Sequence, residues 1–151
     1  MKPEVILYTD GSSRGNPGPG GYGSVLIYRG ADGVEHKKEL SGGERETTNN
    51  RMELMGVIAG LEALNRPCSV TVHTDTKYVS DAFNQHWIDG WKRNGWKTAG
   101  KKPVLNQDLW LRLLEDMKPH SVTFVWVKGH AGNEYNERCD RLATSAADAQ
   151  A

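Results

Sequence analysis

The sequence has little cysteine and no long hydrophobic run. Its 151 residues include two cysteines, Cys68 and Cys139, which lie far apart and form no C-x-x-C pair. We therefore expect free thiols rather than a disulfide. No apolar stretch approaches the roughly 20 residues that a membrane-spanning helix requires. The apolar stretch near the N-terminus is also too short for a secretory signal peptide. These absences favour a cytoplasmic protein without a membrane partner.

The sequence also has no net charge, because 19 acidic residues balance 19 basic ones. A neutral total by itself argues against a nucleic-acid partner. The distribution is uneven, however: Trp91–Lys102 reads WKRNGWKTAGKK, with five basic residues and no acidic one. Such a local patch can bind a polyanion although the whole chain is neutral.

The length and the order of the predicted elements favour one α/β domain over residues 1–151. A chain of this size buries roughly 68–70% of its unfolded surface, which provides a core without disulfides. β-branched and aromatic runs predict strands at Glu4–Thr9, Tyr22–Tyr28, Gly33–Leu40, Ser69–Thr74 and Val122–Val127. Helical spacing of apolar residues predicts helices at Asn49–Leu64, Lys77–Phe83, Gln107–Met117 and Asn133–Ala147. An antiparallel start followed by crossover helices implies a mixed sheet with helices on its faces.

The stretch GPGGYG, Gly18–Gly23, matches the dinucleotide fingerprint G-x-G-x-x-G. In that fold the glycines open a helix. Here Gly23 leads instead into SVLIYR, which is typical of a strand. We therefore interpret the glycines as a loop that turns the chain back into an antiparallel neighbour.

Four acidic residues stand at or near the ends of predicted elements. Taken singly, each has an ordinary interpretation: Asp10 as a turn residue, Asp75 as a helix N-cap, Glu53 as half of a capping box with Asn50, and Asp140 as an exposed helical acid. Taken together, they can converge beyond the strand ends of a twisted sheet. Carboxylates at one point repel each other unless cations lie among them. Mg²⁺ prefers such oxygen ligands, and no cysteine or histidine cluster suggests zinc.

Five segments carry a resemblance to a known family: YTDGSSRGNPGPGGYG, TTNNRMEL, HTDTKYV, WKRNGWK and WVKGHAGNEYNERCDRLA. In this order, from about Val5 to Ala143, they resemble the bacterial form of the type 1 ribonuclease H enzymes. The resemblance implies a ribonuclease H-like fold, with a five-stranded mixed sheet whose first three strands are antiparallel. It also implies an endonuclease that cuts the RNA strand of an RNA–DNA hybrid and leaves 5′-phosphate and 3′-hydroxyl ends.

The resemblance assigns the catalytic residues. Asp10, Glu53, Asp75 and Asp140 would bind two Mg²⁺ ions, with Mn²⁺ as an alternative, and His130 would assist proton transfer or product release. Two ions of this kind can activate the attacking water and stabilise the leaving oxygen.

The resemblance also assigns substrate contacts. It places Gly11 and Ser12 near the RNA 2′-hydroxyl. It places Asn16, Asn49 and Asn50 at the minor groove, and Thr48 at a phosphate of the DNA strand. On the DNA backbone it places Trp87, Trp91, Lys92, Arg93, Trp96 and Lys97. The alternative for the tryptophans is a helix face packed on the core, and for the asparagines turn and cap chemistry.

The sequence departs from the family pattern at several points. Thr76 follows Asp75 where serine is commoner, which is a conservative change, and two other departures concern DNA binding. An additional residue near Asn84 lengthens the connection to Trp87, and Gly90 stands where the family often has asparagine, which puts the DNA-phosphate pocket in doubt. Two rival functions are a transposase- or resolvase-like DNA nuclease and a non-catalytic nucleic-acid-binding module. The VKGHAGN motif and the basic tryptophan run oppose the first, and the four acids oppose the second. We expect a monomer.

Overall fold

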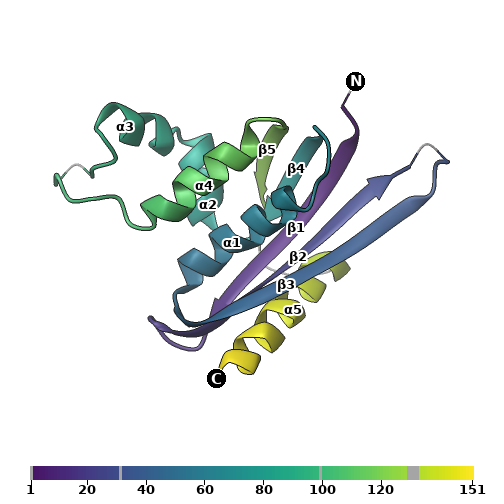
Figure 1. The fold of residues 1–151 in the computed structure, drawn as a ribbon, viewed down its shortest axis with the longest axis horizontal. Helices are drawn as coiled ribbons and strands as arrows, with labels where there is room; N and C mark the ends of the chain where they lie inside the picture. The colour runs from purple at the N-terminus through teal and green to yellow at the C-terminus, as the bar shows by residue number, and fades with distance from the viewer. Residues whose placement is uncertain (1, 31, 99, 129–132) are drawn as a thin grey trace.

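The computed structural model describes residues 2–30, 32–98, 100–128 and 133–151. Its five strands form one sheet in the order β3-β2-β1-β4-β5 (Figure 1). The strands are β1 Glu4–Ser13, β2 Gly18–Arg29, β3 Glu35–Thr47, β4 Ser69–Thr74 and β5 Ser121–Trp126. β1, β2 and β3 pair antiparallel, whereas β4 pairs parallel with both β1 and β5. The expected five-stranded mixed sheet is confirmed.

Helices cover both faces of this sheet. They are α1 Asn49–Glu62, α2 Lys77–Asn84, α3 Trp87–Arg93, α4 Gln107–Met117 and α5 Glu134–Gln150. In Figure 1, α1, α2 and α4 lie on one side of the sheet, and α5 (yellow) lies against β1, β2 and β3 on the other. The larger core cluster includes Leu7, Ile58, Val72 and Trp110, all with no exposed surface.

The glycines of GPGGYG do not form the hairpin loop, which corrects the sequence interpretation. They lie inside β2, and the turn is made by the residues between Ser13 and Gly18. Two of them are needed because α5 packs directly on the strand. A Cβ atom on Gly21 would lie 2.6 Å from the Ala143 carbonyl oxygen, and one on Gly23 would lie 2.4 Å from that of Cys139.

Helix α3 is an element that the sequence interpretation did not place among its helices. Trp91 packs against the buried Trp110, with ring centroids 5.4 Å apart. Trp91 and Trp96 both contact the main core, whereas Trp87 is 41% exposed. The alternative of a helix face packed on the core is therefore confirmed for Trp91, whereas Trp96 packs on the core from the segment that follows α3.

The structure also bears on the two cysteines and on the question of a membrane-spanning helix. Cys68 and Cys139 are both free and both buried. Within the described ranges, no helix has the length and apolar character needed to cross a membrane.

Candidate active site

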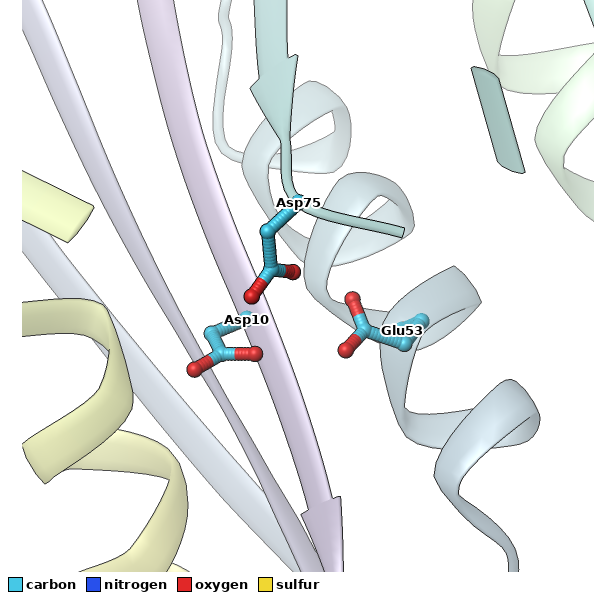
Figure 2. A group of neighbouring side chains, drawn as sticks. All are labelled: Asp10, Glu53 and Asp75. Atoms are coloured by element: carbon cyan, nitrogen blue, oxygen red, sulfur yellow. The ribbon is translucent and has the colours of Figure 1, made fainter. Parts of the chain in front are cut away.

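Three of the four predicted acidic residues meet at one point. Asp10, Glu53 and Asp75 each offer a carboxylate oxygen, and these oxygens all lie within 4.8 Å of one another. Figure 2 shows the three side chains converging from β1, from α1 and from the residue that follows β4. We call these three residues the carboxylate group.

Strand pairing explains why Asp10 and Asp75 are neighbours. Asp10 was expected at the end of the first strand. It lies instead inside β1, opposite Gly23. The parallel pairing of β1 with β4 stops at Tyr8 and His73, while β1 continues beside β2 as far as Ser13. Asp10 therefore lies where β1 leaves β4, and Asp75 follows β4 at the same edge. Sites in α/β sheets form where neighbouring strands separate in this way.

Gly11 allows Glu53 to reach Asp10. The Gly11 N–H donates to Asp10 Oδ1 at 2.9 Å and to Glu53 Oε1 at 3.1 Å. A Cβ atom at position 11 would lie 2.4 Å from the backbone nitrogen of Glu53 and 2.5 Å from the carbonyl carbon of Met52. Only a residue without a side chain lets β1 and α1 approach this closely.

The helix caps differ from the sequence interpretation. The N-cap of α1 is Thr48, whose hydroxyl accepts a hydrogen bond from the Arg51 N–H at 3.2 Å, so the proposed capping box of Asn50 and Glu53 was wrong. The N-cap of α2 is Thr76 rather than Asp75. Threonine hydroxyls thus satisfy both helix starts.

The electrostatics of the carboxylate group favour a bound cation. Asp10 is 4% exposed and Glu53 is 7% exposed. Burial raises the pKa of Glu53 well above its usual value, and the nearby Asp10 and Asp75 charges raise it further. Glu53 Oε2 is buried and has no hydrogen-bond partner among the described residues. A buried oxygen of this kind, in a set made only of carboxylates, fits a hard divalent ion.

Asp140 is separate from this group. Asp140 lies half-buried in α5 and is not one of the three clustered carboxylates. The preceding Cys139 contacts Gly23, the β2 partner of Asp10, so this turn of α5 passes behind β1 and β2 near Asp10. Burial, together with the charge of Asp10, raises the pKa of the Cys139 thiol to about 12. His130 lies outside the described residues.

The residues predicted to contact the minor groove come together at one end of the sheet. Asn16, Asn49 and Asn50 line a polar pocket of about 340 Å³ with Ser13 and Gly15. The Asn49 amide oxygen accepts a 2.6 Å hydrogen bond from the Ser13 N–H, which fixes α1 to the end of β1. The three asparagines are exposed, whereas Gly11, Ser12 and Thr48 are half-buried close by in sequence.

The predicted DNA-binding residues lie on and after α3. Lys92, Arg93 and Lys97 are exposed, and in Figure 1 this segment projects from the side of the molecule that carries α4. Gly90 lies in the middle of α3, and a Cβ atom added to it would have no atom outside the helix backbone within 4 Å. Asn84, near the predicted insertion, donates its amide to the Phe124 carbonyl oxygen at 3.1 Å and so ties α2 to β5.

Two contacts near the site were not expected from the sequence. The Trp126 indole N–H donates to the Asp75 carbonyl oxygen at 3.1 Å. Arg51 forms an ion pair with Asp108 at 2.8 Å, which joins α1 to α4. Both contacts join residues more than 50 positions apart, and no local pattern marks such pairs.

Comparison with known proteins places the chain in a family. The RNase H family profile matches residues 2–148. The chain is 60% identical to Ribonuclease H of Lachnoclostridium phytofermentans over 146 residues, which are 96% of this chain and 92% of that protein. The solved structure of LC9-RNase H1, a type 1 RNase H with the type 2 active-site motif, has a TM-score of 0.87 at 32% identity and covers 100% of this chain and 75% of that chain. LC11-RNase H1, solved in complex with an RNA/DNA hybrid, has a TM-score of 0.62 at 25% identity and covers 96% and 97% of the two chains. The chain therefore belongs to the RNase H family of enzymes.

Proposed function

We propose that the chain is an endonuclease that hydrolyses the RNA strand of RNA–DNA hybrids by a two-metal-ion mechanism, leaving 5′-phosphate and 3′-hydroxyl ends. The carboxylate group is the observation that carries this proposal, because it lies in a chain whose family members are named ribonucleases H. The proposal treats residues 1–151 as one catalytic domain that acts as a monomer.

Asp10, Glu53 and Asp75 would hold the ions, with Asp140 added from α5. Mg²⁺ is the expected ion and Mn²⁺ an alternative, because both accept carboxylate oxygens. When bound, two such ions supply activation of the attacking water and stabilisation of the leaving 3′-oxygen. Asp10 would hold the ions from the middle of this set, because its side chain lies between Glu53 on one side and α5 on the other (Figure 2).

The chain's own contribution is to hold these carboxylates in place before substrate arrives. The Gly11 N–H fixes one oxygen each of Asp10 and Glu53. Because the pKa of Glu53 is raised, ion binding must displace a proton or relieve like-charge repulsion. Binding of the ion is therefore expected to strengthen as the pH rises.

His130 is proposed to assist proton transfer or product release. The support is its position in the VKGHAGN motif, within the part of the chain that resembles the family. A histidine suits this role because its ordinary pKa lies near neutral pH.

Recognition of RNA is proposed to occur beside the carboxylate group. Backbone groups of Gly11 and Ser12, with Glu53, would contact the 2′-hydroxyl, which distinguishes RNA from DNA. Around them, Asn16, Asn49 and Asn50 would contact the minor groove, and Thr48 would contact a phosphate of the DNA strand. The shared pocket of the three asparagines supports this assignment.

The DNA strand is proposed to lie on the segment that contains α3. Lys92, Arg93 and Lys97 would neutralise phosphates, which gives affinity without sequence preference. Trp87, Trp91 and Trp96 would contact the backbone through their remaining exposed surface. The exposure of the three basic side chains supports this role.

A cleavage assay on three duplexes of the same sequence tests the function. With Mg²⁺, RNA–DNA hybrid should be cut within its RNA strand, and duplex RNA and duplex DNA should remain intact. Labelled products should carry 5′-phosphates. Preferred cutting of duplex DNA would indicate the transposase-like alternative, and binding without cutting of any duplex would indicate a non-catalytic module.

A further inference from the structure

Three aromatic rings stack on the side of the sheet that α5 covers. They belong to Tyr8 in β1, His73 in β4 and Tyr135 in α5. The centroid of the Tyr8 ring lies 5.0 Å from that of His73, with 30° between the ring planes, and 5.0 Å from that of Tyr135, with 33°. Rings at such distances attract each other beyond the area that they bury. We call these three residues the ring stack.

Each ring precedes, along its own element, an acid that we propose binds the ions. In β1 the ring lies two residues before Asp10, and in β4 it lies two residues before Asp75, which follows that strand. In α5 the ring lies five residues before Asp140. Residues two apart in a strand face the same side of the sheet, so the β1 ring and Asp10 share the face that α5 covers. The ring stack therefore joins the three elements that position Asp10, Asp75 and Asp140.

The ring stack extends the packing of α5 toward β4. α5 packs on β1, β2 and β3, and Gly21 and Gly23 admit its backbone close to β2. Arg138 of α5 also forms a two-pronged ion pair with Glu39 of β3, at 2.7 and 2.9 Å. The glycine contacts and this ion pair lie at β2 and β3, on the side of β1 away from β4. They fix the height of α5 above the sheet, whereas the ring stack ties its first turn to β1 and, through β1, to β4.

The position of α5 matters for Asp140, which lies half-buried in this helix and outside the carboxylate group. To share an ion with Asp10, Asp140 needs α5 at a fixed distance from β1. The contact between Tyr8 and Tyr135 fixes that distance about one and a half helical turns before Asp140. Tyr8 is itself buried in the sheet, so the ring of Tyr135 rests on a rigid partner.

We propose that the ring stack positions α5 so that Asp140 can bind an ion together with Asp10, with Tyr135 as the positioning residue. The inference rests on the proposed function, because it requires Asp140 to be an ion ligand. None of the three rings needs to touch the ion or the substrate. Side chains that orient metal ligands in this way commonly change metal affinity by about 10–100-fold when they are replaced.

The test compares Tyr135→Ala with Tyr135→Phe, which keeps the ring and removes only the hydroxyl. Tyr28→Ala is a matched control, since Tyr28 of β2 stacks on His36 of β3 with ring centroids 5.2 Å apart and 19° between the planes, near the end of β2. Both alanine variants lose a ring pair and should lose some melting temperature. Tyr135→Leu keeps apolar bulk without a flat ring, and it replaces Tyr135→Ala if that variant is unfolded at the assay temperature.

Calorimetry without substrate should show a Mn²⁺ Kd about tenfold higher in Tyr135→Ala, and wild-type affinity in Tyr135→Phe and Tyr28→Ala. In an Asp140→Asn background, Tyr135→Ala should weaken Mn²⁺ binding no further, because the ring acts through Asp140. On RNA–DNA hybrid, Tyr135→Ala should need about tenfold more Mg²⁺ for half-maximal cleavage, with KM for the hybrid unchanged at saturating Mg²⁺. Unchanged Mn²⁺ affinity in Tyr135→Ala, or an equal further loss in the Asp140→Asn background, would overturn the inference.

The single variant Asp140→Asn separates this failure from failure of the proposed function. If Asp140→Asn keeps wild-type Mn²⁺ affinity and cleavage, Asp140 is not an ion ligand, and both the proposed function at this point and the inference are wrong. If Asp140→Asn weakens Mn²⁺ binding while Tyr135→Ala behaves as wild type, Asp140 binds the ion and only the role of the ring stack is wrong.

Discussion

The distance between Asp10 and Glu53 is set by the glycine that follows Asp10. β1 and α1 come close at Gly11 because there is no side chain between them, and the Gly11 N–H then serves both carboxylates. The approach brings the two acids into a buried position, where burial and then the charge of Asp10 raise the pKa of Glu53. The chain thus accepts electrostatic strain in the ion-free state at the residues that we propose bind the ions.

Gly11→Ala is predicted to separate these elements. Its Cβ would meet backbone atoms of Met52 and Glu53 that cannot rotate away, so the free energy of unfolding should fall by about 1–3 kcal/mol and Mn²⁺ affinity should drop. Urea unfolding and calorimetry measure the two effects.

Gly90→Ala is the matched control for this substitution. Nothing lies within 4 Å of a Cβ at that position, which is inside α3. Alanine should therefore stabilise the helix by about 0.5–1 kcal/mol and leave Mn²⁺ binding unchanged. Equal effects at the two glycines would contradict the account of Gly11.

Asp10→Asn is predicted to raise the melting temperature when divalent ions are removed by a chelator. The substitution removes one charge beside Glu53, whose pKa is raised first by burial and then by that charge. A gain of about 1 kcal/mol corresponds to about 2–4 °C in a chain of this size. Saturating Mg²⁺ should reduce the difference, because only the wild type gains full stability from the ion. A lower melting temperature of the variant in chelator would show that the charges do not oppose folding.

The sequence predicts the carboxylate group better than it predicts how the group is held. Asp10, Glu53 and Asp75 were expected to converge, and they do. The capping box with Asn50 was wrong. Thr48, two residues earlier, has a hydroxyl that can cap the helix equally well, and which residue becomes the N-cap depends on where β3 ends.

At the scale of elements, α1 and α4 contact each other near their C-terminal ends, where a carboxyl group of each helix lies beside the other. Arg112 binds Glu62, and Asp116 lies beside Glu62 with a buried oxygen, Oδ2, that has no hydrogen-bond partner among the described residues. Burial, followed by the adjacent Glu62, raises the pKa of Asp116 to about 7. The contact between these helices should therefore respond to pH.

Asp116→Asn is predicted to change the pH dependence of stability. Because the pKa of Asp116 is higher in the folded state, the folded chain holds an extra proton from the unfolded value of about 4 up to about 7, and the free energy of unfolding falls as the pH rises through this window. The variant does not lose stability in this way, so its free energy of unfolding should rise relative to that of the wild type between pH 4 and 7. Parallel pH profiles of melting temperature would rule out a raised pKa.

The segment Trp91–Lys97, which we call the basic arm, should give hybrid binding its dependence on salt. Lys92→Ala/Arg93→Ala is predicted to reduce the slope of log affinity against log salt concentration by about 1–2, because two phosphate contacts are lost. Lys118→Ala, an exposed change at the opposite end of α4, is the control and should keep the wild-type slope. An unchanged slope in the double variant would place the DNA strand elsewhere.

Elements were predicted best where packing and local pattern agree. β4 and α4 have the expected bounds. α3 was not among the predicted helices and was considered only as the alternative for the tryptophans, because its seven residues depend on the packing of Trp91 against Trp110, a contact across the chain. The glycines of β2 resemble a loop in sequence, and only the approach of α5 explains them as strand residues.

At the scale of the whole molecule, the site exists because the sheet changes from antiparallel to parallel at β1. The antiparallel pairing with β2 carries Asp10 beyond the end of β4, α1 covers one side, and α5 passes on the other (Figure 1). The order of elements predicted this mixed sheet, since helices separate the later strands. Pairing register was not predictable, because it depends on side chains from several elements at once.

The central claim is that the carboxylate group performs the cleavage and is not required for binding. The most direct measurement compares wild type and Asp10→Asn on one RNA–DNA hybrid, with cleavage followed in Mg²⁺ and binding followed in chelator. We predict no detectable cleavage by Asp10→Asn and a Kd within about twofold of the wild type, because charge is lost at the ions' site and not at the basic arm. Mg²⁺-dependent cleavage by pure Asp10→Asn at a rate near that of the wild type would contradict the account.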